Sequence, residues 1–292
     1  MFYTTFLFCY SIYKKEESMK KFFVLFLGES SRNHMAAITH IIEHKEFIDS
    51  FQGFEFIPFN DNDFVDIVSK KIDSLKEQDI EPIIMKGFNI HTEDYIRPLI
   101  KYYKNKHPKE KFFLSHCACF NNFILTDGAL LTKYTKENIE SVIKNAIELR
   151  NKLKDIIVDY RLSKTIVMLN AGGDTNFNTA PDYWKEIYDK LPKETDDYRL
   201  EMTQLDVALS ESIRLQKKYE DTTLPTIVIP SSINEANSIW KTLTVVAQKY
   251  LAGIVVGLPM YIGLTSRTDS DESICRTLDV LLKIMKKDNK DE

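Results

Sequence analysis

Glycine is scarce in this chain, with nine glycines among 292 residues. No G-x-G-x-x-G and no G-x-x-x-x-G-K-[ST] segment occurs, and these are the glycine-rich loops with which Rossmann domains and P-loop proteins cradle phosphates. The sequence therefore argues against both of these nucleotide-binding classes. A bound phosphate would have to be held in another way.

Cysteine is also sparse, and the four that occur form no repeated C-x-x-C pair: Cys9, Cys117, Cys119 and Cys275. Such sparse use in a chain of this size suits a reducing compartment, so we expect a cytoplasmic protein. Cys117 and Cys119 occupy alternate positions of an apolar run, which predicts that both pack on one buried face of a strand.

Neither sign of charge dominates, since 39 basic residues stand against 43 acidic ones and the formal net charge is −4. Such a balance lacks the broad positive field that attracts nucleic acids, so we expect no nucleic acid as a partner. An anionic ligand must then be bound by a few individually placed cations. With 43% apolar residues, the chain can bury an ordinary core.

Long apolar runs are absent as well. Met1 to Tyr13 is apolar and aromatic, but about a dozen residues fall short of the roughly 20 that span a bilayer. No basic residue precedes this run and no small-residue cleavage site is evident, so it does not resemble a signal peptide. We treat residues 1–18 as an extension, place the start of the fold at Met19 and expect no membrane partner.

The chain does contain an alternation of short apolar runs with longer amphipathic stretches, which is typical of α/β proteins with a mainly parallel sheet. The strand candidates are 22–27, 54–58, 82–85, 112–120, 123–126, 165–169, 226–229, 254–257 and 262–265. The stretches with helical spacing of apolar residues are 33–47, 64–76, 92–103, 136–154, 181–190, 205–219, 234–250 and 270–286. Thr135 and Ser232 stand where helix N-caps are expected.

One strand candidate ends in a group of side chains that suit an oxyanion. Thr265 ends the run, Ser266 and Arg267 follow it, and a helix candidate starts at Ser270. The hydroxyls, the guanidinium, and the free N–H groups and positive dipole end of the following helix could all point at one phosphate. A strand that simply ends in a helix cap with a solvated arginine has the same pattern, and the segment alone does not decide between the two.

A second strand end carries two further cations. Lys86 leaves the strand candidate 82–85, and Arg97 lies one to two turns inside the next helix candidate. Both could reach a cleft at the carboxyl edge of the sheet, where open α/β folds bind their ligands. Taken alone, the pattern around Arg97 favours an arginine on a solvated helix face.

Two hydrolase motifs are suggested only weakly. His40 to His44 matches H-x-x-E-H, in which histidines one helical turn apart bind zinc. No downstream carboxylate ligand is identifiable, so an ordinary amphipathic helix is the better interpretation and no metal site is expected. Ser266 does not lie in a G-x-S-x-G elbow, which argues against a Ser-His-Asp hydrolase.

Read together, several blocks resemble the phosphate acetyl/butyryltransferase family, and its butyryltransferase branch most of all. The most specific block is AGIVVG at 252–257 followed by LTSRTDSDE at 264–272, which is similar to that branch's signature. Four further blocks agree in order: Met85-Lys86-Gly87, Leu114-Ser115-His116 ahead of Phe120, Leu125-Thr126-Asp127, and Leu205-Asp206 with Ala208. Asp94 to Pro98 is similar to a helix of the acetyl branch whose arginine serves the phosphate or coenzyme A site.

The resemblance runs from about Met19 to Lys286 and implies two α/β domains with mainly parallel sheets and a cleft between them, an isopropylmalate dehydrogenase-like architecture. Residues 19–110 plus 251–292 would form the first domain, and residues 111–250 would form the second domain and a homodimer interface. The reaction implied is acyl-CoA plus phosphate giving acyl phosphate plus coenzyme A, with coenzyme A as a substrate and no cofactor.

The resemblance also implies roles for particular residues. It assigns catalysis to Ser266, Arg267 and Arg97. It assigns the binding of phosphate and coenzyme A to Lys86, Thr92, Ser115, Asp206, Asn237, Thr265 and Asp269.

The chain departs from the family pattern at several positions. The segment P-[DE]-x-x-x-G-N-x-x-x-K keeps Asn237 and Lys241 but has Ser231 and Ala236 in place of the acidic residue and the glycine. The Gly-Pro before the Leu-Asp block is Glu201-Met202, and Lys109 replaces an arginine, which keeps the charge but loses the planar fork.

One departure concerns proton transfer. Ser273 stands where the acetyl branch has an aspartate that handles the thiol proton, which leaves Asp269, Asp271 and Glu272 as candidates. The butyryl branch lacks this aspartate as well, so its loss alone does not argue for inactivity. Three hypotheses remain: an active phosphate acyltransferase, a catalytically impaired homologue that binds coenzyme A or acyl phosphate, and an oxidoreductase of related architecture. The last is disfavoured because no metal-binding acidic cluster or nucleotide motif occurs.

Overall fold

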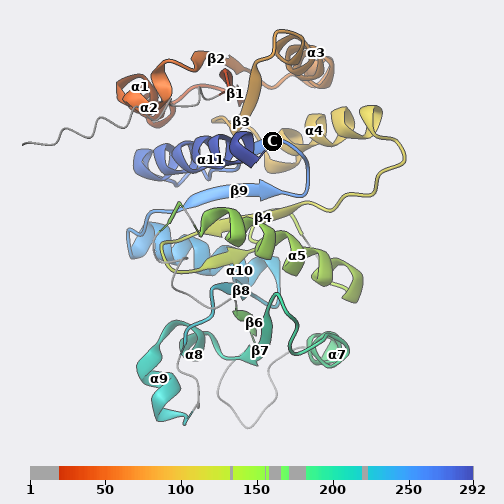
Figure 1. Cartoon of the computed structure of the whole chain (residues 1–292), viewed down its shortest axis with the longest axis vertical. Coiled ribbons are helices and arrows are strands. Elements are labelled where there is room, and N and C mark those ends of the chain that lie inside the picture. Colours follow the sequence, from red (N-terminus) through yellow and green to blue (C-terminus); the bar gives the residue numbers. More distant parts are fainter. Residues whose placement is uncertain are drawn as a thin grey trace, which may run out of the picture.

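The computed structural model describes residues 20–131, 134–154, 156–157, 166–170, 182–218 and 223–291. Within these residues, ten strands form one sheet (Figure 1). Their order across the sheet is β2 (Phe51–Ile57), β1 (Phe22–Leu27), β3 (Glu81–Lys86), β10 (Tyr261–Gly263), β9 (Ala252–Val256), β4 (Ser115–Cys119), β5 (Ile124–Thr126), β8 (Ile227–Ile229), β6 (Ile166–Asn170) and β7 (Arg199–Thr203).

The sheet consists of two parallel blocks joined by antiparallel strands. β2, β1, β3 and β10 are parallel to one another, and so are β5, β8, β6 and β7. Between the blocks, β9 is antiparallel to β10 and to β4, and β4 is antiparallel to β5. The predicted α/β fold with a mainly parallel sheet is confirmed, whereas the predicted division into two domains stays a prediction.

Helices cover both faces of this sheet because alternate residues of each strand point to opposite sides. In β1, Val24 and Phe26 belong to one buried cluster, and Leu25 and Leu27 belong to the other. The first cluster packs against α1 (Arg32–Glu43), α2 (Lys45–Ile48), α5 (Lys136–Leu153), α7 (Asp182–Lys190) and α11 (Asp271–Asp291). The second packs against α3 (Phe64–Glu77), α4 (Thr92–Lys106), α8 (Leu205–Leu209) and α10 (Ile233–Lys241), while the short α9 (Glu211–Gln216) follows α8.

The sequence failed to predict one strand, β7. Arg199 and Glu201 interrupt its apolar pattern, but both side chains take part in a group of charged hydrogen bonds. The Glu201 carboxylate accepts hydrogen bonds from Arg199 at 2.6 Å and from the fully buried Arg214 at 2.9 and 3.2 Å. Glu201, which departs from the family pattern, therefore compensates a buried guanidinium.

Several predicted helices are broken. The candidate 33–47 is interrupted at His44, whose ring stacks on Phe47 with centroids 4.8 Å apart. The candidate 205–219 is interrupted at Ser210, which caps α9. The candidate 234–250 changes at Lys241 into a π-helical turn, η1 (Thr242–Val246).

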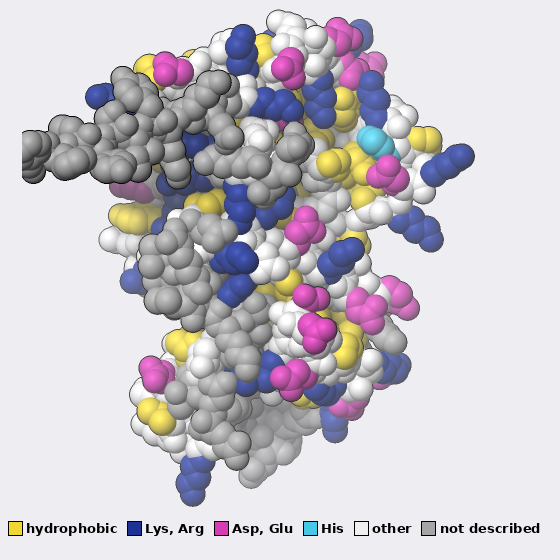
Figure 2. Space-filling view, in the orientation of Figure 1, with side chains coloured by type: hydrophobic (Ala, Val, Ile, Leu, Met, Phe, Trp, Pro, Cys, Tyr) yellow, Lys and Arg dark blue, Asp and Glu magenta, His cyan; other side chains and the backbone are white. Residues whose placement is uncertain are grey.

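The predicted helix N-caps and the buried cysteine pair are confirmed. The hydroxyls of Thr135 and Ser232 accept the N-cap hydrogen bonds of α5 and α10. Cys117 and Cys119 are buried in the same cluster, whereas Cys9 lies outside the described residues. Among the described helices, none combines the length and apolar composition needed to cross a membrane. Figure 2 shows basic and acidic side chains interspersed over one face of the molecule.

Candidate functional site

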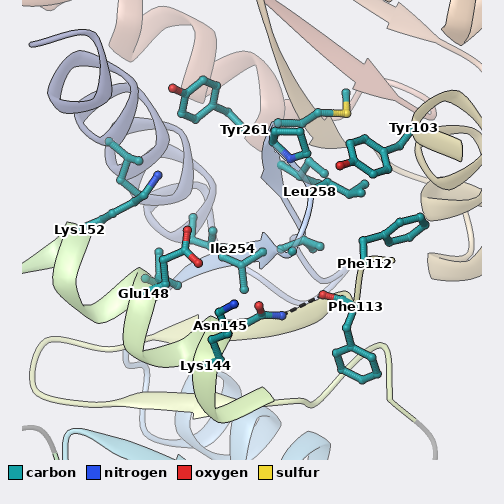
Figure 3. Close-up of a pocket in the computed structure, with 18 of the residues that line it drawn as sticks. Tyr103, Phe112, Phe113, Lys144, Asn145, Glu148, Lys152, Ile254, Leu258 and Tyr261 are labelled. Carbon is teal, nitrogen blue, oxygen red and sulfur yellow. Dashed lines mark hydrogen bonds between the residues drawn. The ribbon is translucent and has the colours of Figure 1, made fainter. Parts of the chain in front are cut away.

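The larger of two notable cavities, about 960 Å³, lies at the amino ends of β1, β3 and β10. It runs between α5 and the loop 257–260 (Figure 3). Some of its polar groups bind to one another. Asn145 donates a hydrogen bond to the Phe113 carbonyl at 2.9 Å, and Lys152 forms an ion pair with Asp288 at 2.9 Å. None of the predicted site residues lines it, so size alone does not identify the site.

A smaller cavity of about 450 Å³ lies at the carboxyl ends of β3 and β10, against α10 and the start of α4. This edge is where parallel α/β sheets bind their ligands. The cavity brings together residues that are far apart in the sequence. Six of the predicted site residues line it: Lys86, Thr92, Asn237, Thr265, Ser266 and Arg267.

The segment after β10 is held in a fixed turn. The Thr265 hydroxyl donates to the Lys86 carbonyl at 3.3 Å, which fastens the end of β10 to the end of β3. The backbone N–H of Ser266 donates to the Asp269 carboxylate at 2.7 Å. Burial raises the pKa of Asp269 to about 6, although this hydrogen bond and the nearby lysines act in the opposite direction. The turn leaves the Ser266 side chain on the cavity wall.

Three cationic side chains share this cavity. Lys86 is only 5% exposed, and burial, together with the charges of Arg267 and Lys241, lowers its pKa to about 8. Lys241 ends α10, and its ammonium donates to the Ser266 hydroxyl and to Thr268 Oγ1, the latter at 3.1 Å. Arg267 is exposed at the rim. Because the charges of Arg267 and Lys241 are close enough to lower the pKa of Lys86, a bound anion would relieve their repulsion.

A helix N-terminus also borders the cavity, but it is not the expected one. The sequence suggested the helix after Ser270, yet α11 begins at Asp271 and its first turn does not line the cavity. Instead, α4 begins there with Thr92, and its N-cap residue His91 makes no side-chain capping bond. The positive end of the α4 dipole thus favours an anion at this place.

Four predicted site residues lie outside the lining. Arg97 is exposed on α4, where it donates to Asp94 at 2.8 Å. Ser115 is buried at the start of β4 and accepts a hydrogen bond from Asn145 at 3.1 Å. Asp206 is exposed at the start of α8. Asp269 lies behind the Ser266 turn and borders a cavity of about 200 Å³ that shares Thr265, Ser266 and Arg267 with the 450 Å³ cavity. The ligand roles of these four residues stay predictions.

The changed segment before Lys241 keeps its place in the fold. Ser231, which replaces an acidic residue, donates through its backbone N–H and its hydroxyl to the Glu235 carboxylate, both at 2.7 Å. Ala236 is fully buried and does not line the cavity. Beside it, Asn237 donates to the Gly128 carbonyl at 3.0 Å. The added methyl group therefore occupies a packing position and leaves the ligand space open.

Sequence reasoning did not include Lys241 among the predicted site residues, although a signal was present. Asn237 and Lys241 are one helical turn apart, so both fall on the same face of α10. Behind them, the buried His116 stacks on Trp240 with ring centroids 4.6 Å apart. Burial and the Lys241 charge lower the pKa of His116 to about 3, so this ring is neutral at physiological pH.

Lys86→Met should weaken phosphate binding and also stabilise the fold. The folded pKa of about 8 lies below the unfolded value of 10.5, so the buried charge destabilises the protein fully below pH 8 and the effect disappears as the pH rises to 10.5. At pH 7, removing the charge should increase the free energy of unfolding by about 2–3 kcal/mol in urea titrations.

The same lysine should make phosphate binding depend on pH. Calorimetry on the unmodified protein should show the Kd for phosphate rising by up to about tenfold per pH unit above pH 8 as Lys86 loses its proton. Lys86→Met should bind more weakly at pH 7 and show a flatter profile. Equal affinity of the two proteins at pH 7 would contradict the assignment of Lys86 to the anion.

No family model and no curated protein sequence matches this chain. Solved structures do. A branched-chain phosphotransacylase from Enterococcus faecalis V583 is similar with a TM-score of 0.65 and 19% identity over 90% of this chain and 99% of that one. A phosphotransacetylase from Staphylococcus aureus gives 0.55 and 13%, over 91% and 94%. One from Streptococcus pyogenes gives 0.54 and 13%, over 92% and 94%. The chain therefore has the fold of the phosphotransacylases, as its motifs predicted.

Proposed function

We propose that this protein is a phosphate acyltransferase that moves a short acyl group, of butyryl or acetyl type, between coenzyme A and inorganic phosphate. The observation that carries the proposal is the shared cavity of Lys86, Lys241 and Arg267 beside the Ser266 hydroxyl. The fold similarity to phosphotransacylases supports it. We further propose a cytoplasmic homodimer that associates through residues 111–250 and needs no cofactor.

The residues of the site can take different roles in this reaction. Lys86 and the start of α4 would hold the phosphate deep in the cavity, while Arg267 would bind its outer oxygens with a planar pair of donors. The Ser266 hydroxyl would face the reacting acyl group. The thiol of coenzyme A would then attack the carbonyl carbon of that group directly in a ternary complex. Cations that offset the charge on phosphate and on the thiolate lower the barrier, and holding both substrates in place contributes further.

One observation favours the second hypothesis, a protein that binds coenzyme A or acyl phosphate without turnover. Ser273, at the place of the acetyl-branch aspartate, is buried and its hydroxyl accepts the Leu251 N–H at 3.4 Å. It therefore offers no base to the cavity. If no other residue removes the proton of the coenzyme A thiol, the protein would bind coenzyme A without catalysing the transfer.

A substrate panel separates the two hypotheses. We expect phosphate-dependent release of free thiol from at least one of acetyl-, propionyl-, butyryl- and isobutyryl-CoA, and no release when sulfate replaces phosphate. Calorimetry with coenzyme A should run in parallel. Binding of coenzyme A without turnover of any acyl-CoA would support the non-catalytic homologue and overturn the enzyme.

A further inference from the structure

The proposed reaction has to remove the proton of the coenzyme A thiol, and the acidic residues near the signature are poorly placed for it. Asp271 and Glu272 are exposed at the start of α11 and do not line the cavity. Asp269 receives the Ser266 N–H on one oxygen and does not line the cavity that holds Lys86 and Lys241; it borders a smaller cavity on the other side of the Thr265–Arg267 segment. A different group has to face the thiol.

Lys241 meets this requirement by position. It is the last residue of α10, whose start is fixed by the Ser232 cap and whose face is held to Gly128 through Asn237. The π-helical turn η1 follows at once, and such turns are frequent at functional sites. The Lys241 amine lies within hydrogen-bonding distance of Ser266 Oγ and also contacts Thr268 Oγ1 at 3.1 Å. Two hydroxyls of one turn thus fix a single amine.

We propose that Lys241 is the general base of the acyl transfer and acts on the thiol through the Ser266 hydroxyl. The inference rests on the proposed function. As the thiol sulfur bonds to the acyl carbon, its proton passes to Ser266 Oγ and the serine proton passes to neutral Lys241 Nζ. The bond from the acyl carbon to the phosphate oxygen breaks, and phosphate leaves with its electron pair. In reverse, protonated Lys241 returns the proton through Ser266 to the departing thiolate.

The surroundings of Lys241 lower the affinity of its amine for a proton. Burial is the main cause that lowers the pKa of Lys241, and Arg267 lowers it further while Asp269 raises it. Lys86 approaches from the end of β3, and the neutral His116 lies behind on β4. Among the described residues, the titratable side chains that line this cavity are those of Lys86, His91, Lys241 and Arg267. More cations than carboxylates face the amine, which favours release of its proton.

Amine rescue of Lys241→Ala tests the proposal. We expect Lys241→Ala to lose about 10²–10³-fold in kcat and to regain activity with added methylamine in proportion to the neutral amine present. Lys241→Arg should be equally impaired, because a guanidinium keeps the charge but does not release its proton in this pH range. Lys249→Ala, an exposed lysine outside the cavity lining, is the matched control and should retain wild-type activity.

Three results would overturn the assignment. Activity of Lys241→Arg within about threefold of wild type would show that only the charge matters. Failure of methylamine to rescue a Lys241→Ala protein that still binds coenzyme A would exclude proton transfer as its role. Loss of the alkaline-rising limb of the kcat–pH profile in Asp269→Asn but not in Lys241→Ala would name the carboxylate as base. If the wild-type protein shows no turnover, the proposed function is wrong, and the assignment of Lys241 as general base is wrong with it.

Discussion

Arg267→Ala should lose about 10²–10³-fold in phosphate-dependent release of coenzyme A while the fold remains intact. Arg267 is exposed at the cavity rim and follows the fixed Ser266 turn, so its guanidinium can meet the outer oxygens of a bound phosphate. The lost charge would leave the phosphate and the developing thiolate less well compensated. Steady-state kinetics with a good acyl-CoA, together with a thermal melt, measure both effects.

Arg267→Lys and Arg97→Ala sharpen this test. Lysine keeps the charge but not the planar pair of donors, so an intermediate loss is expected. Arg97 is paired with Asp94 outside the cavity lining. A loss in Arg97→Ala as large as that in Arg267→Ala would show that Arg97 leaves this ion pair and enters the site during turnover. If Arg267→Ala kept most of its activity, the phosphate site would have to lie elsewhere.

Gly253→Ala should destabilise the protein by about 3 kcal/mol or more and reduce its activity as well. A Cβ atom at Gly253 would lie 2.1 Å from the carbonyl oxygen of Leu264 and 3.1 Å from its carbonyl carbon. Both are backbone atoms, so β9 and β10 would have to separate. Leu264 directly precedes Thr265, Ser266 and Arg267, so the same displacement would move the turn that carries Ser266.

Urea denaturation and kinetics on the same preparation measure the two effects of Gly253→Ala. Ala252→Gly in the neighbouring position is the matched control, because it removes a methyl group from the same strand and should cost only about 1 kcal/mol. An active Gly253→Ala protein with unchanged stability would mean that β10 does not hold the turn as described.

The sequence predicted several of the residues that line one cavity because parallel strands bring their carboxyl ends to one edge. Lys86 and Thr265 each follow a strand candidate, and β3 and β10 turn out to be direct neighbours. The signature block can also be understood physically, since Gly253 permits the close approach that positions Leu264. A strand end followed by hydroxyls and cations was enough to predict this part of the cavity lining.

Other parts could not be predicted from local patterns. Lys241 reaches the cavity because α10 borders it from Ile233 to Lys241, and the local sequence does not specify which cavity a helix borders. The α4 terminus borders the cavity in place of the expected α11 terminus, because the turn held by Asp269 separates Ser266 from the later helix. β7 was not predicted because its charged residue Glu201 accepts a hydrogen bond from Arg214, which lies in a later helix and cannot be identified from the local pattern.

The insertion of β9 and β10 between β3 and β4 also has a consequence for biosynthesis. β3 and β4 are made early, yet the two strands that join them come from residues 252–263, which follow all the other described strands. Until these residues leave the ribosome, the facing edges of β3 and β4 have no neighbours, and open strand edges are where nascent chains pair wrongly. Residues 252–263, which follow all the other described strands in the chain, thus join the two halves of the sheet and place Ser266 at the cavity in the same step.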